Sequence, residues 1–153
     1  MHFEPLTPHH ASLLAVLHKD AFADVWDAHA FAGLLAHPGA FGFIALSDKK
    51  DPAGFILLRM AADEAEIITM AVLPAHKRQG IARALLDHAR TDASARGVVS
   101  LFLEVGETNA AARALYEKAG FVLTGQRPGY YKKGYDGSGA PEDALILVCR
   151  LGA

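Results

Sequence analysis

A basic, glycine-bearing turn separates an apolar run from a helix in the stretch AVLPAHKRQGIARALLDHAR, residues 71–90. Where a strand leads through such a turn into a helix, free backbone N–H groups and the positive end of the helix dipole meet at one point. Gly80 would let a ligand approach this backbone closely, and Lys77, Arg78 and Arg83 add positive charge. The pattern predicts a local phosphate or anion site. The alternative is an ordinary surface turn with solvated charges.

Two other phosphate-binding loops are excluded by their motifs. The chain has no G-x-x-x-x-G-K-[ST] sequence, so a P-loop that binds a triphosphate with magnesium is not supported. It also has no G-x-G-x-x-G followed about 20 residues later by an acidic residue, so a dinucleotide site is not indicated. The basic turn therefore needs a different anionic ligand.

The composition limits the classes of protein to consider. The chain has 153 residues, 52% apolar and 21% charged, and we expect a single domain over residues 1–153. Its net charge of -2 argues against a nucleic-acid partner, which requires a broad cationic face. No apolar stretch approaches the roughly 20 residues of a membrane span, and the start, MHFEPLTPHH, lacks the features of a signal peptide. We therefore expect no membrane partner.

Cysteine and histidine usage gives two further expectations. The single cysteine, Cys149, lies in the apolar run LILVCR and is predicted to be a small buried residue rather than a reactive thiol. One cysteine cannot form a disulfide within the chain, so we predict a reducing, cytoplasmic location. The eight histidines form no H-E-x-x-H motif and no Cys/His spacing typical of metal sites, so no metal is predicted.

Hydrophobic periodicity predicts the elements that must position the turn. Helices are expected over residues 9–22, 26–37, 79–96 and 108–120, and strands over 40–47, 53–60, 64–73, 98–105, 121–126 and 143–150. Such an order predicts an α/β (α+β) fold, a mixed sheet of six to seven strands with about four helices on both faces. The glycine-rich segment 129–141 is too short for a domain boundary and is expected to be a loop or lid.

The turn and the order of elements resemble the GNAT superfamily of acyl-CoA-dependent N-acetyltransferases. The family motif [QR]-x-x-G-x-[GA] is matched by Lys77-Arg78-Gln79-Gly80-Ile81-Ala82, with lysine in place of the first Gln or Arg. The segment LEVGETNAAARALYEKAGF, residues 103–121, looks like LEVRxSNxxAxxLYxxxGF of the bacterial ribosomal-protein alanine N-acetyltransferases. The specific resemblance covers roughly residues 40–150, and the first 39 residues match only loosely. It implies a mostly antiparallel central sheet.

The resemblance implies that acetyl-CoA is the acyl donor and that the turn cradles its pyrophosphate, largely through backbone N–H groups. A bulge in the central strand would free further N–H groups for the oxyanion and the pantetheine arm. The residues implied to bind the cofactor are Met70, Ala71, Val72, Lys77, Arg78, Gln79, Gly80, Ile81, Ala82, Arg83, Asn109 and Arg113.

Two residues match catalytic positions of the family. Glu104 is implied to be the general base, directly or through water; alternatively, it pairs with Arg59 or Lys118. Tyr116 is implied to be the general acid toward the coenzyme A sulfur; alternatively, it packs under the sheet. A tyrosine pKa of about 10 exceeds the thiol value of about 8.5, so transfer to a free thiolate is uphill by about 2 kcal/mol. Concerted transfer or a lowered tyrosine pKa would then be required.

The acceptor amine is expected to meet aromatic residues. These are Trp26 and Phe31 of the second helix region, with Val25, and Tyr130, Tyr131 and Tyr135 of the lid. An α-amino group of pKa about 7.7–8.0 is much more often neutral at pH 7 than a lysine, so one carboxylate base suffices for it. The departures from the family pattern lie here: Gly106 stands where the family usually has Arg, and Glu107-Thr108 replace x-Ser.

Three functions are compatible with these residues. The first is an N-acetyltransferase of a protein or peptide α-amino group, and the second is an N-acetyltransferase of a small amine. The third is a catalytically silent acyl-CoA-binding regulator, which the presence of Glu104 and Tyr116 disfavours.

Overall fold

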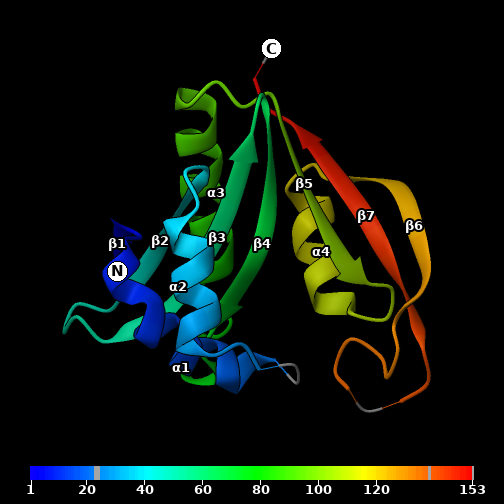
Figure 1. The fold of residues 1–153 in the computed structure, drawn as a ribbon, viewed down its shortest axis with the longest axis horizontal. Helices are drawn as coiled ribbons and strands as arrows, with labels where there is room; N and C mark the ends of the chain where they lie inside the picture. Colours follow the sequence, from blue (N-terminus) through cyan, green and yellow to red (C-terminus); the bar gives the residue numbers. More distant parts are fainter. Residues whose placement is uncertain (23–24, 138, 153) are drawn as a thin grey trace.

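The computed structural model describes residues 1–22, 25–137 and 139–152, and seven of their strands form one sheet in the order β1-β2-β3-β4-β5-β7-β6 (Figure 1). The β4–β5 pair is parallel and every other pair is antiparallel. The elements are β1 (His2–Pro5), α1 (Ala11–Ala21), α2 (Ala28–Ala36), β2 (Ala40–Leu46), β3 (Pro52–Ala61), β4 (Glu64–Val72), α3 (Ile81–Ala95), β5 (Ser100–Gly106), α4 (Ala110–Lys118), β6 (Val122–Tyr131) and β7 (Glu142–Arg150), with short 3-10 helices at Pro8–His10 and Pro74–His76.

The predicted fold class, a mostly antiparallel mixed sheet with four helices, is confirmed. One strand was not predicted: β1, which pairs with β2 at the sheet edge. Its four residues, HFEP, are mostly exposed and end in proline, so they show no alternation of apolar and polar side chains. Such an edge strand is defined by its partner rather than by its own sequence.

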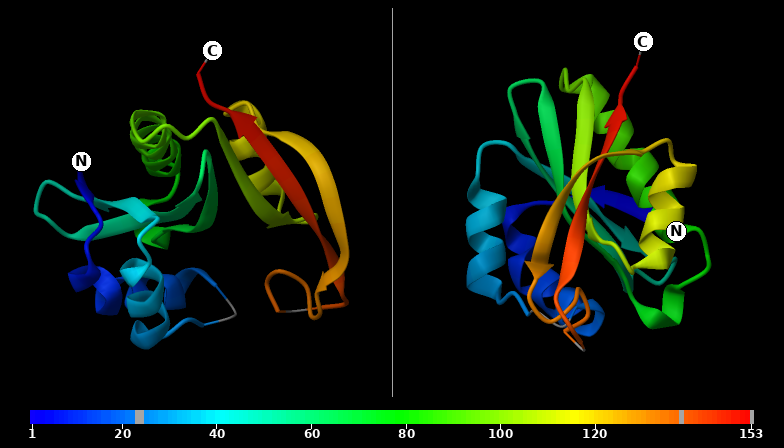
Figure 2. Two further views of the ribbon diagram at one scale, coloured as in Figure 1. Left: turned by 45° about the horizontal axis from the view of Figure 1, so that its top comes forward. Right: turned by 90° about the vertical axis from the view of Figure 1, so that its right-hand side faces the viewer.

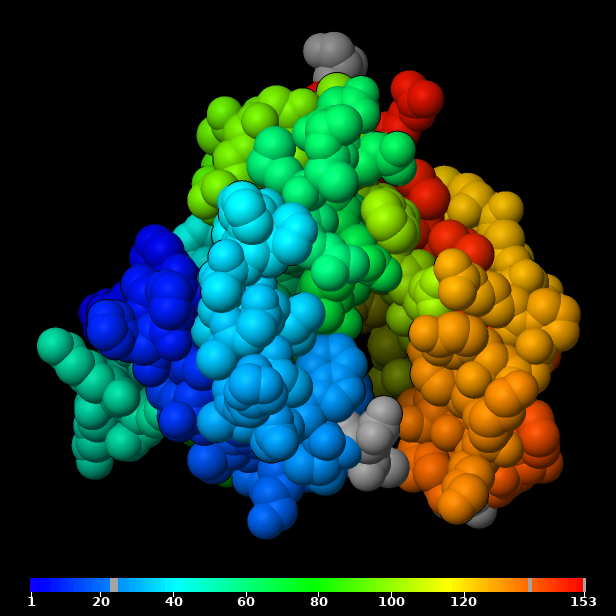
Figure 3. Space-filling model, in the orientation of Figure 1, coloured from blue at the N-terminus to red at the C-terminus, as the bar shows by residue number. Residues whose placement is uncertain are grey.

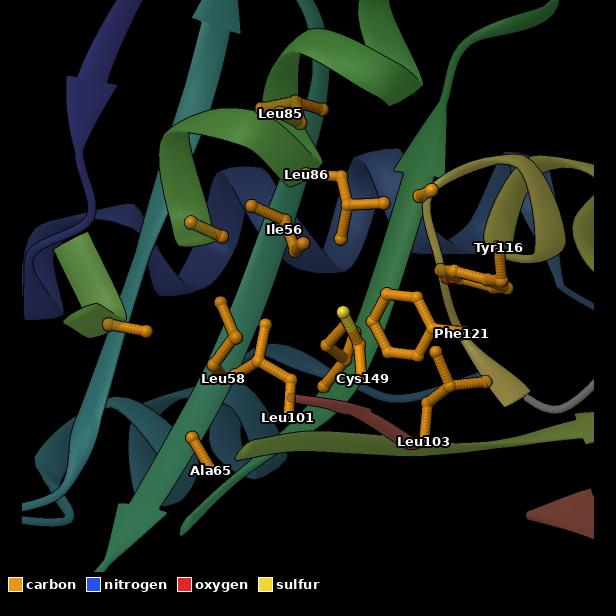
Figure 4. Packing of buried hydrophobic residues seen from close by; sticks show 14 of the residues in the cluster. Ile56, Leu58, Ala65, Leu85, Leu86, Leu101, Leu103, Tyr116, Phe121 and Cys149 are labelled. Atoms are coloured by element: carbon orange, nitrogen blue, oxygen red, sulfur yellow. The ribbon is translucent and has the colours of Figure 1, made fainter. Parts of the chain in front are cut away.

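Helices cover both faces of the sheet (Figure 2). Helices α3 and α4 pack on one face, where α3 contributes a stripe that includes Leu85, Leu86 and Ala89. Cys149 is buried in the same cluster, as predicted (Figure 4). Helices α1 and α2 pack on the other face through a second cluster centred on Phe31 and neighbouring apolar side chains. The two clusters fix the sheet between two helical layers.

Strands β4 and β5 separate soon after they start. Their ladder pairs join Glu64–Glu66 to 100–102, and no pair follows within the described residues. The space-filling view shows the molecule hollowed between the N-terminal helices and β6 (Figure 3). On its other edge β4 carries a bulge, because Leu57 pairs with Thr69 while Leu58 pairs with Ile67. The bulge predicted for this strand is thus present, with Ile68 as its extra residue.

Strand β6 is longer than predicted and runs to Tyr131. Pro128 and Gly129 interrupt its register with β7, and Gly129 has φ +61°. We predicted that the loop begins at Gly129, but an edge strand tolerates both Pro128 and Gly129 because one side of it needs no ladder partner. Tyr130 and Tyr131 therefore belong to a strand, and the loop is limited to residues 132–141, of which Ser138 lies outside the described residues.

Candidate active site

A cleft with a volume of about 970 Å³ opens where β4 and β5 separate. Its walls come from β4, β5, the α1–α2 region, the start of α4, and β6 with the loop that follows. The lining residues that the sequence predicted are Trp26, Met70, Glu104, Asn109, Tyr116, Tyr130, Tyr131 and Tyr135, and those it missed include His18, Glu66 and Thr69. Side chains far apart in the sequence therefore share one cavity.

The basic turn forms the start of α3 and is exposed. Gly80 is the N-cap of α3 with φ +76°, and no side chain caps the helix. The Ala84 N–H donates to the Gly80 carbonyl at 3.0 Å. The N–H groups of Ile81, Ala82 and Arg83 belong to the first turn, which has no intrahelical acceptors for them. A Cβ built at Gly80 meets nothing within 4 Å. The turn thus offers backbone donors and open space, as an anion requires.

Side chains around the turn contribute unequal amounts of positive charge to it. Lys77, Arg78 and Gln79 are exposed, and Arg78 has φ +63°. The Arg83 Nε donates to Asp87 Oδ1 at 3.1 Å, so its charge is shared with a carboxylate one helical turn away. Lys77 and Arg78 are therefore better placed than Arg83 to add charge at the turn.

Of the three β4 residues predicted to offer backbone N–H groups, the structure favours two. The Leu73 N–H donates to Ala53 of β3 at 2.8 Å. Because N–H directions alternate along a strand, the Ala71 N–H also points toward β3, whereas those of Met70 and Val72 point toward the opened edge. Ala71 pairs with Phe55 of β3 in the ladder. Met70 and Val72 are thus the candidate donors, and Ala71 is not.

Glu104 lies on the cleft wall, and its ion-pair partner is neither of the two that we considered. Arg127 of β6 binds it, with 3.0 Å between Arg127 Nε and Glu104 Oε1. Arg59 instead pairs with Glu66, 3.6 Å away. The Glu104 side chain is 17% exposed, so a ligand in the cleft can reach it. No local pattern indicated Arg127, because it meets Glu104 across the intervening strand β7.

Tyr116 packs in the core, as one of its two alternatives predicted, and it also lines the cleft, where its role as general acid stays a prediction. Its ring lies edge-on to Phe121, with 5.4 Å between ring centroids. Burial raises the pKa of Tyr116, so the hydroxyl is protonated at neutral pH. The option of a lowered tyrosine pKa is therefore wrong, and a proton can leave Tyr116 only as the receiving group becomes basic.

Two residues at the start of α4 were predicted to meet the cofactor. Asn109 is the N-cap of α4 and accepts a hydrogen bond from the Ala112 N–H at 3.3 Å, and it also lines the cleft. Arg113 donates to the Glu107 carbonyl at 2.8 Å and pairs with Glu117 at 3.9 Å. Arg113 is not among the lining residues, so its observed contacts support the helix start rather than the cleft.

Aromatic residues form much of the acceptor side of the cleft. Trp26 stacks on His18 with 4.8 Å between ring centroids, and both residues line the cavity. Phe31 is fully buried against Trp26 and Phe55, so it lies behind the wall and supports it, contrary to its predicted contact with the acceptor. Val25 is exposed but is not a lining residue.

Tyr130 and Tyr131 are lining residues on β6. Burial, followed by the charge of Glu104, raises the pKa of Tyr131 to about 12. Tyr131 is therefore a neutral phenol beside Glu104 at neutral pH. Together with Trp26, the two tyrosines supply an aromatic surface in the cleft.

Glu142 ties the loop to β5 and α4. Its carboxylate accepts hydrogen bonds from the Thr108 N–H at 3.0 Å, the Thr108 hydroxyl at 2.8 Å and the Tyr135 N–H at 2.7 Å. Burial alone would raise the pKa of Glu142, but these hydrogen bonds outweigh it and lower the pKa. Tyr135 is held directly over Gly106, where an added Cβ would lie 2.6 Å from the Tyr135 Cβ. Gly106, one of the departures from the family pattern, is therefore in contact with the loop.

Comparison with known proteins identifies the family. The sequence profile of the acetyltransferase (GNAT) family matches residues 10–121. The chain belongs to the GNAT family. It is 44% identical over 96 residues to the [ribosomal protein bS18]-alanine N-acetyltransferase of Escherichia coli K12, covering 63% of this chain and 62% of that protein. Streptothricin acetyltransferase of Streptomyces lavendulae is 35% identical over 92 residues, covering 59% of this chain and 49% of that protein.

The fold agrees over the whole chain. The crystal structure of the Escherichia coli ribosomal-protein-S18-alanine N-acetyltransferase superposes with a TM-score of 0.85 and 31% identity, covering 99% of this chain and 94% of that one. The match to the curated Escherichia coli relative spans less than two thirds of its length. The GNAT profile ends at residue 121, so β6, the loop and β7 lie beyond it.

Two kinds of feature are absent from the part of this GNAT chain that the structure describes. Within the residues that the structure describes, no helix is long and apolar enough to cross a membrane. Among the same residues, no group of three or more His, Cys, Asp or Glu side chains could hold a metal ion.

Proposed function

We propose that this GNAT chain transfers the acetyl group of acetyl-CoA to the α-amino group of a protein or peptide N-terminus. The observation that carries the proposal is one cleft lined by both Glu104 and Tyr116 and bordered by β4, the strand that leads into the α3 turn. The Escherichia coli relatives are named for acetylating a ribosomal-protein alanine, and we propose the same class of acceptor here.

The α3 turn fits the pyrophosphate of acetyl-CoA. Its exposed N–H groups and its unobstructed Gly80 suit a phosphate, and Lys77 and Arg78 add positive charge. Replacement of the first motif residue by Lys77 leaves these backbone donors unchanged. Along β4, the Met70 and Val72 N–H groups would meet the pantetheine arm and the oxyanion that forms on the acetyl carbonyl.

Glu104 and Tyr116 would move the protons of the reaction. Glu104, directly or through a water that it holds, takes a proton from the acceptor ammonium, and the amino nitrogen then attacks the thioester carbonyl carbon. The attack forms the C–N bond and a tetrahedral intermediate with the oxyanion on the acetyl oxygen. When it collapses, the C–S bond breaks, the departing sulfur takes the Tyr116 proton, and the second proton that the nitrogen releases restores the Tyr116 hydroxyl. Because burial raises the pKa of Tyr116, this proton moves while the C–S bond breaks rather than to a preformed thiolate.

A small amine is the second candidate acceptor, because streptothricin acetyltransferase is also a relative. The test is coenzyme A release from acetyl-CoA with a panel of acceptors: peptides with a free N-terminal Ala, Ser, Met or Gly, and lysine, polyamines and aminoglycosides. We expect turnover on a free N-terminus that disappears when the same peptide is N-terminally blocked. Turnover only on small amines would support the second candidate, and binding of acetyl-CoA without turnover on any acceptor would indicate a silent regulator.

A further inference from the structure

Helices α3 and α4 lie on the same face of the sheet but on opposite sides of the point where β4 and β5 separate. Helix α3 packs on β2, β3 and β4, whereas α4 lies beside β5 and β7 (Figure 1). The α3 side carries the turn proposed for the pyrophosphate, and the α4 side carries Tyr116. Proton transfer from Tyr116 to a sulfur held along β4 therefore depends on how the two helices are placed relative to each other.

A side-chain hydrogen bond joins these two helices. Arg90 of α3 donates from Nη1 to the Ala119 carbonyl at the end of α4, and within the described residues it makes the one hydrogen bond between α3 and this end of α4. The helices also share an apolar cluster, which includes Leu86 of α3 and Tyr116 of α4 (Figure 4). Apolar packing has no directional preference, whereas a hydrogen bond has a defined distance and direction. Arg90 therefore fixes how α4 is placed against α3.

The end of α4 does not need Arg90 to close its last turn. Gly120 follows the C-cap Ala119 and has φ +97°. The Phe121 N–H donates to the Tyr116 carbonyl at 3.0 Å, which closes the turn in the usual way for a helix that ends at a left-handed glycine. The Arg90 hydrogen bond is therefore an additional contact, and it holds the same turn that carries Tyr116.

Charges along one face of α3 orient Arg90. Asp87 Oδ1 lies 3.8 Å from Arg90 Nη2, and it also accepts a hydrogen bond from Arg83 Nε at 3.1 Å. The Arg90 side chain is 26% exposed, compared with 43% for Arg83, so its contacts are better shielded from water. A cation at the C-terminal end of a helix also interacts favourably with the helix dipole. These interactions direct the Arg90 guanidinium to the end of α4.

We propose that Arg90 is a positioning residue that places the Tyr116 hydroxyl for proton transfer to the coenzyme A sulfur by holding α4 against α3. The inference rests on the proposed acetyl transfer, with Tyr116 as its general acid. A displacement of about 1 Å between reacting groups can cost much of the rate, even when its cause lies far from them. Arg90 is not among the residues that line the cleft, so its loss should slow the chemical step and leave both substrates bound as before.

The test measures acetyl transfer to the best peptide acceptor in single turnovers, where product release does not limit the rate. Arg90→Met keeps the length of the side chain without its donors and should lower this rate about fivefold, with less than about twofold change in the KM for acetyl-CoA or peptide. Arg90→Lys keeps a cationic donor and should retain more of the rate. Arg96→Met is the matched control, because Arg96 lies on the same helix but pairs with Asp92 at 3.3 Å and lies over the Phe41 ring. It should keep the wild-type rate within about twofold.

A double-mutant cycle separates positioning of Tyr116 from a general structural effect. In the Tyr116→Phe background, Arg90→Met should lower the rate by less than about twofold, because the group that it positions is already gone. All variants are assayed well below the lowest Tm of the set, so that each is folded.

Three results would overturn the positioning role while acetyl transfer stands. They are an unchanged rate in Arg90→Met, an equal loss in Arg96→Met, and an equal fractional loss from Arg90→Met with and without the Tyr116 hydroxyl. A wild type that acetylates no acceptor overturns the proposed function itself.

Discussion

The two halves of the candidate site are built differently. The α3 turn lies within residues 74–83, is exposed at residues 77–80, and offers mainly backbone N–H groups. The acceptor side is assembled from side chains of β4, β5, β6, the loop and the α1–α2 region. A backbone site depends on local conformation, whereas a side-chain site depends on pairings between distant strands. The first half can therefore be predicted from one short motif, whereas a motif predicts only some residues of the second half and none of the contacts between them.

The positions at which the chain departs from the family pattern show the same difference between the backbone-built turn and the side-chain-built acceptor side. Lys77 replaces the usual Gln or Arg at the turn, where its side chain is exposed. At Gly106, by contrast, the missing side chain leaves space that Tyr135 fills. A change in the backbone-built half is thus isolated, while a change in the side-chain half requires a matching change in the loop.

The largest effect is expected at the turn. Gly80→Glu should weaken acetyl-CoA binding at least about a hundredfold, because it places an anion at the start of α3 and forces a non-glycine residue into φ +76°. Isothermal titration calorimetry measures this affinity. Gly80→Ala is the matched control, since it keeps the conformational strain but not the charge and has room for its Cβ. Affinity unchanged in Gly80→Glu would exclude the turn as the pyrophosphate site.

The second-largest effect is expected when Glu104 is replaced, and it should slow the chemical step without weakening acetyl-CoA binding. Glu104→Gln should lower kcat/KM for the peptide about a hundredfold at neutral pH, the usual size for loss of a general base, while acetyl-CoA affinity is retained. The pH profile gives the decisive measurement. A loss that shrinks as pH rises supports a base, because the acceptor amine then deprotonates in solution. A loss of equal size at every pH would indicate that Glu104 only positions the acceptor.

Tyr116→Phe tests the proton transfer to the departing sulfur of coenzyme A. It should lower kcat about tenfold or more with little change in acetyl-CoA affinity, because it removes the proton donor for sulfur but keeps the ring packed on Phe121. Single-turnover kinetics with acetyl-CoA would locate the loss in the chemical step. A variant with full rate would leave Tyr116 as a core residue only.

Sequence periodicity predicted six of the seven strands and all four helices, because each has an apolar pattern of its own. The exposed turn that we propose to bind an anion could also be located from the sequence, since its residues are contiguous. Arg127, Glu66 and Thr69 were not, because their significance depends on strand order and on a bulge that shifts the register by one residue. Phe31 was misassigned for a related reason: periodicity locates a helix but does not tell which apolar side chain reaches the cleft.

A smaller effect should test the contact between Gly106 and Tyr135 of the loop. Gly106→Ala places a Cβ 2.6 Å from the Tyr135 Cβ and must displace the loop, so the peptide KM should rise about fivefold while acetyl-CoA affinity stays unchanged. Tyr135→Gly in the same chain removes the clash, and in the double variant the added cost of Gly106→Ala should vanish. Gly139→Ala in the same loop is the control, because its Cβ would meet nothing within 4 Å. If the effects of the two single substitutions on the free energy of peptide binding, taken from the peptide KM, simply add in the double variant, the two residues are not coupled.

The smallest effect concerns the stability of the acceptor side. Hydrogen bonds from Thr108 and Tyr135 outweigh burial and lower the pKa of Glu142, so its stabilising contribution is complete above its unfolded value of about 4.5 and is lost as pH falls through the lower folded value. Glu142→Gln should therefore lower Tm by about 2–4 °C at pH 7, and the difference from the wild type should narrow below pH 4.5. Differential scanning calorimetry across this range tests the sign. A gap that widens at low pH would contradict a lowered pKa.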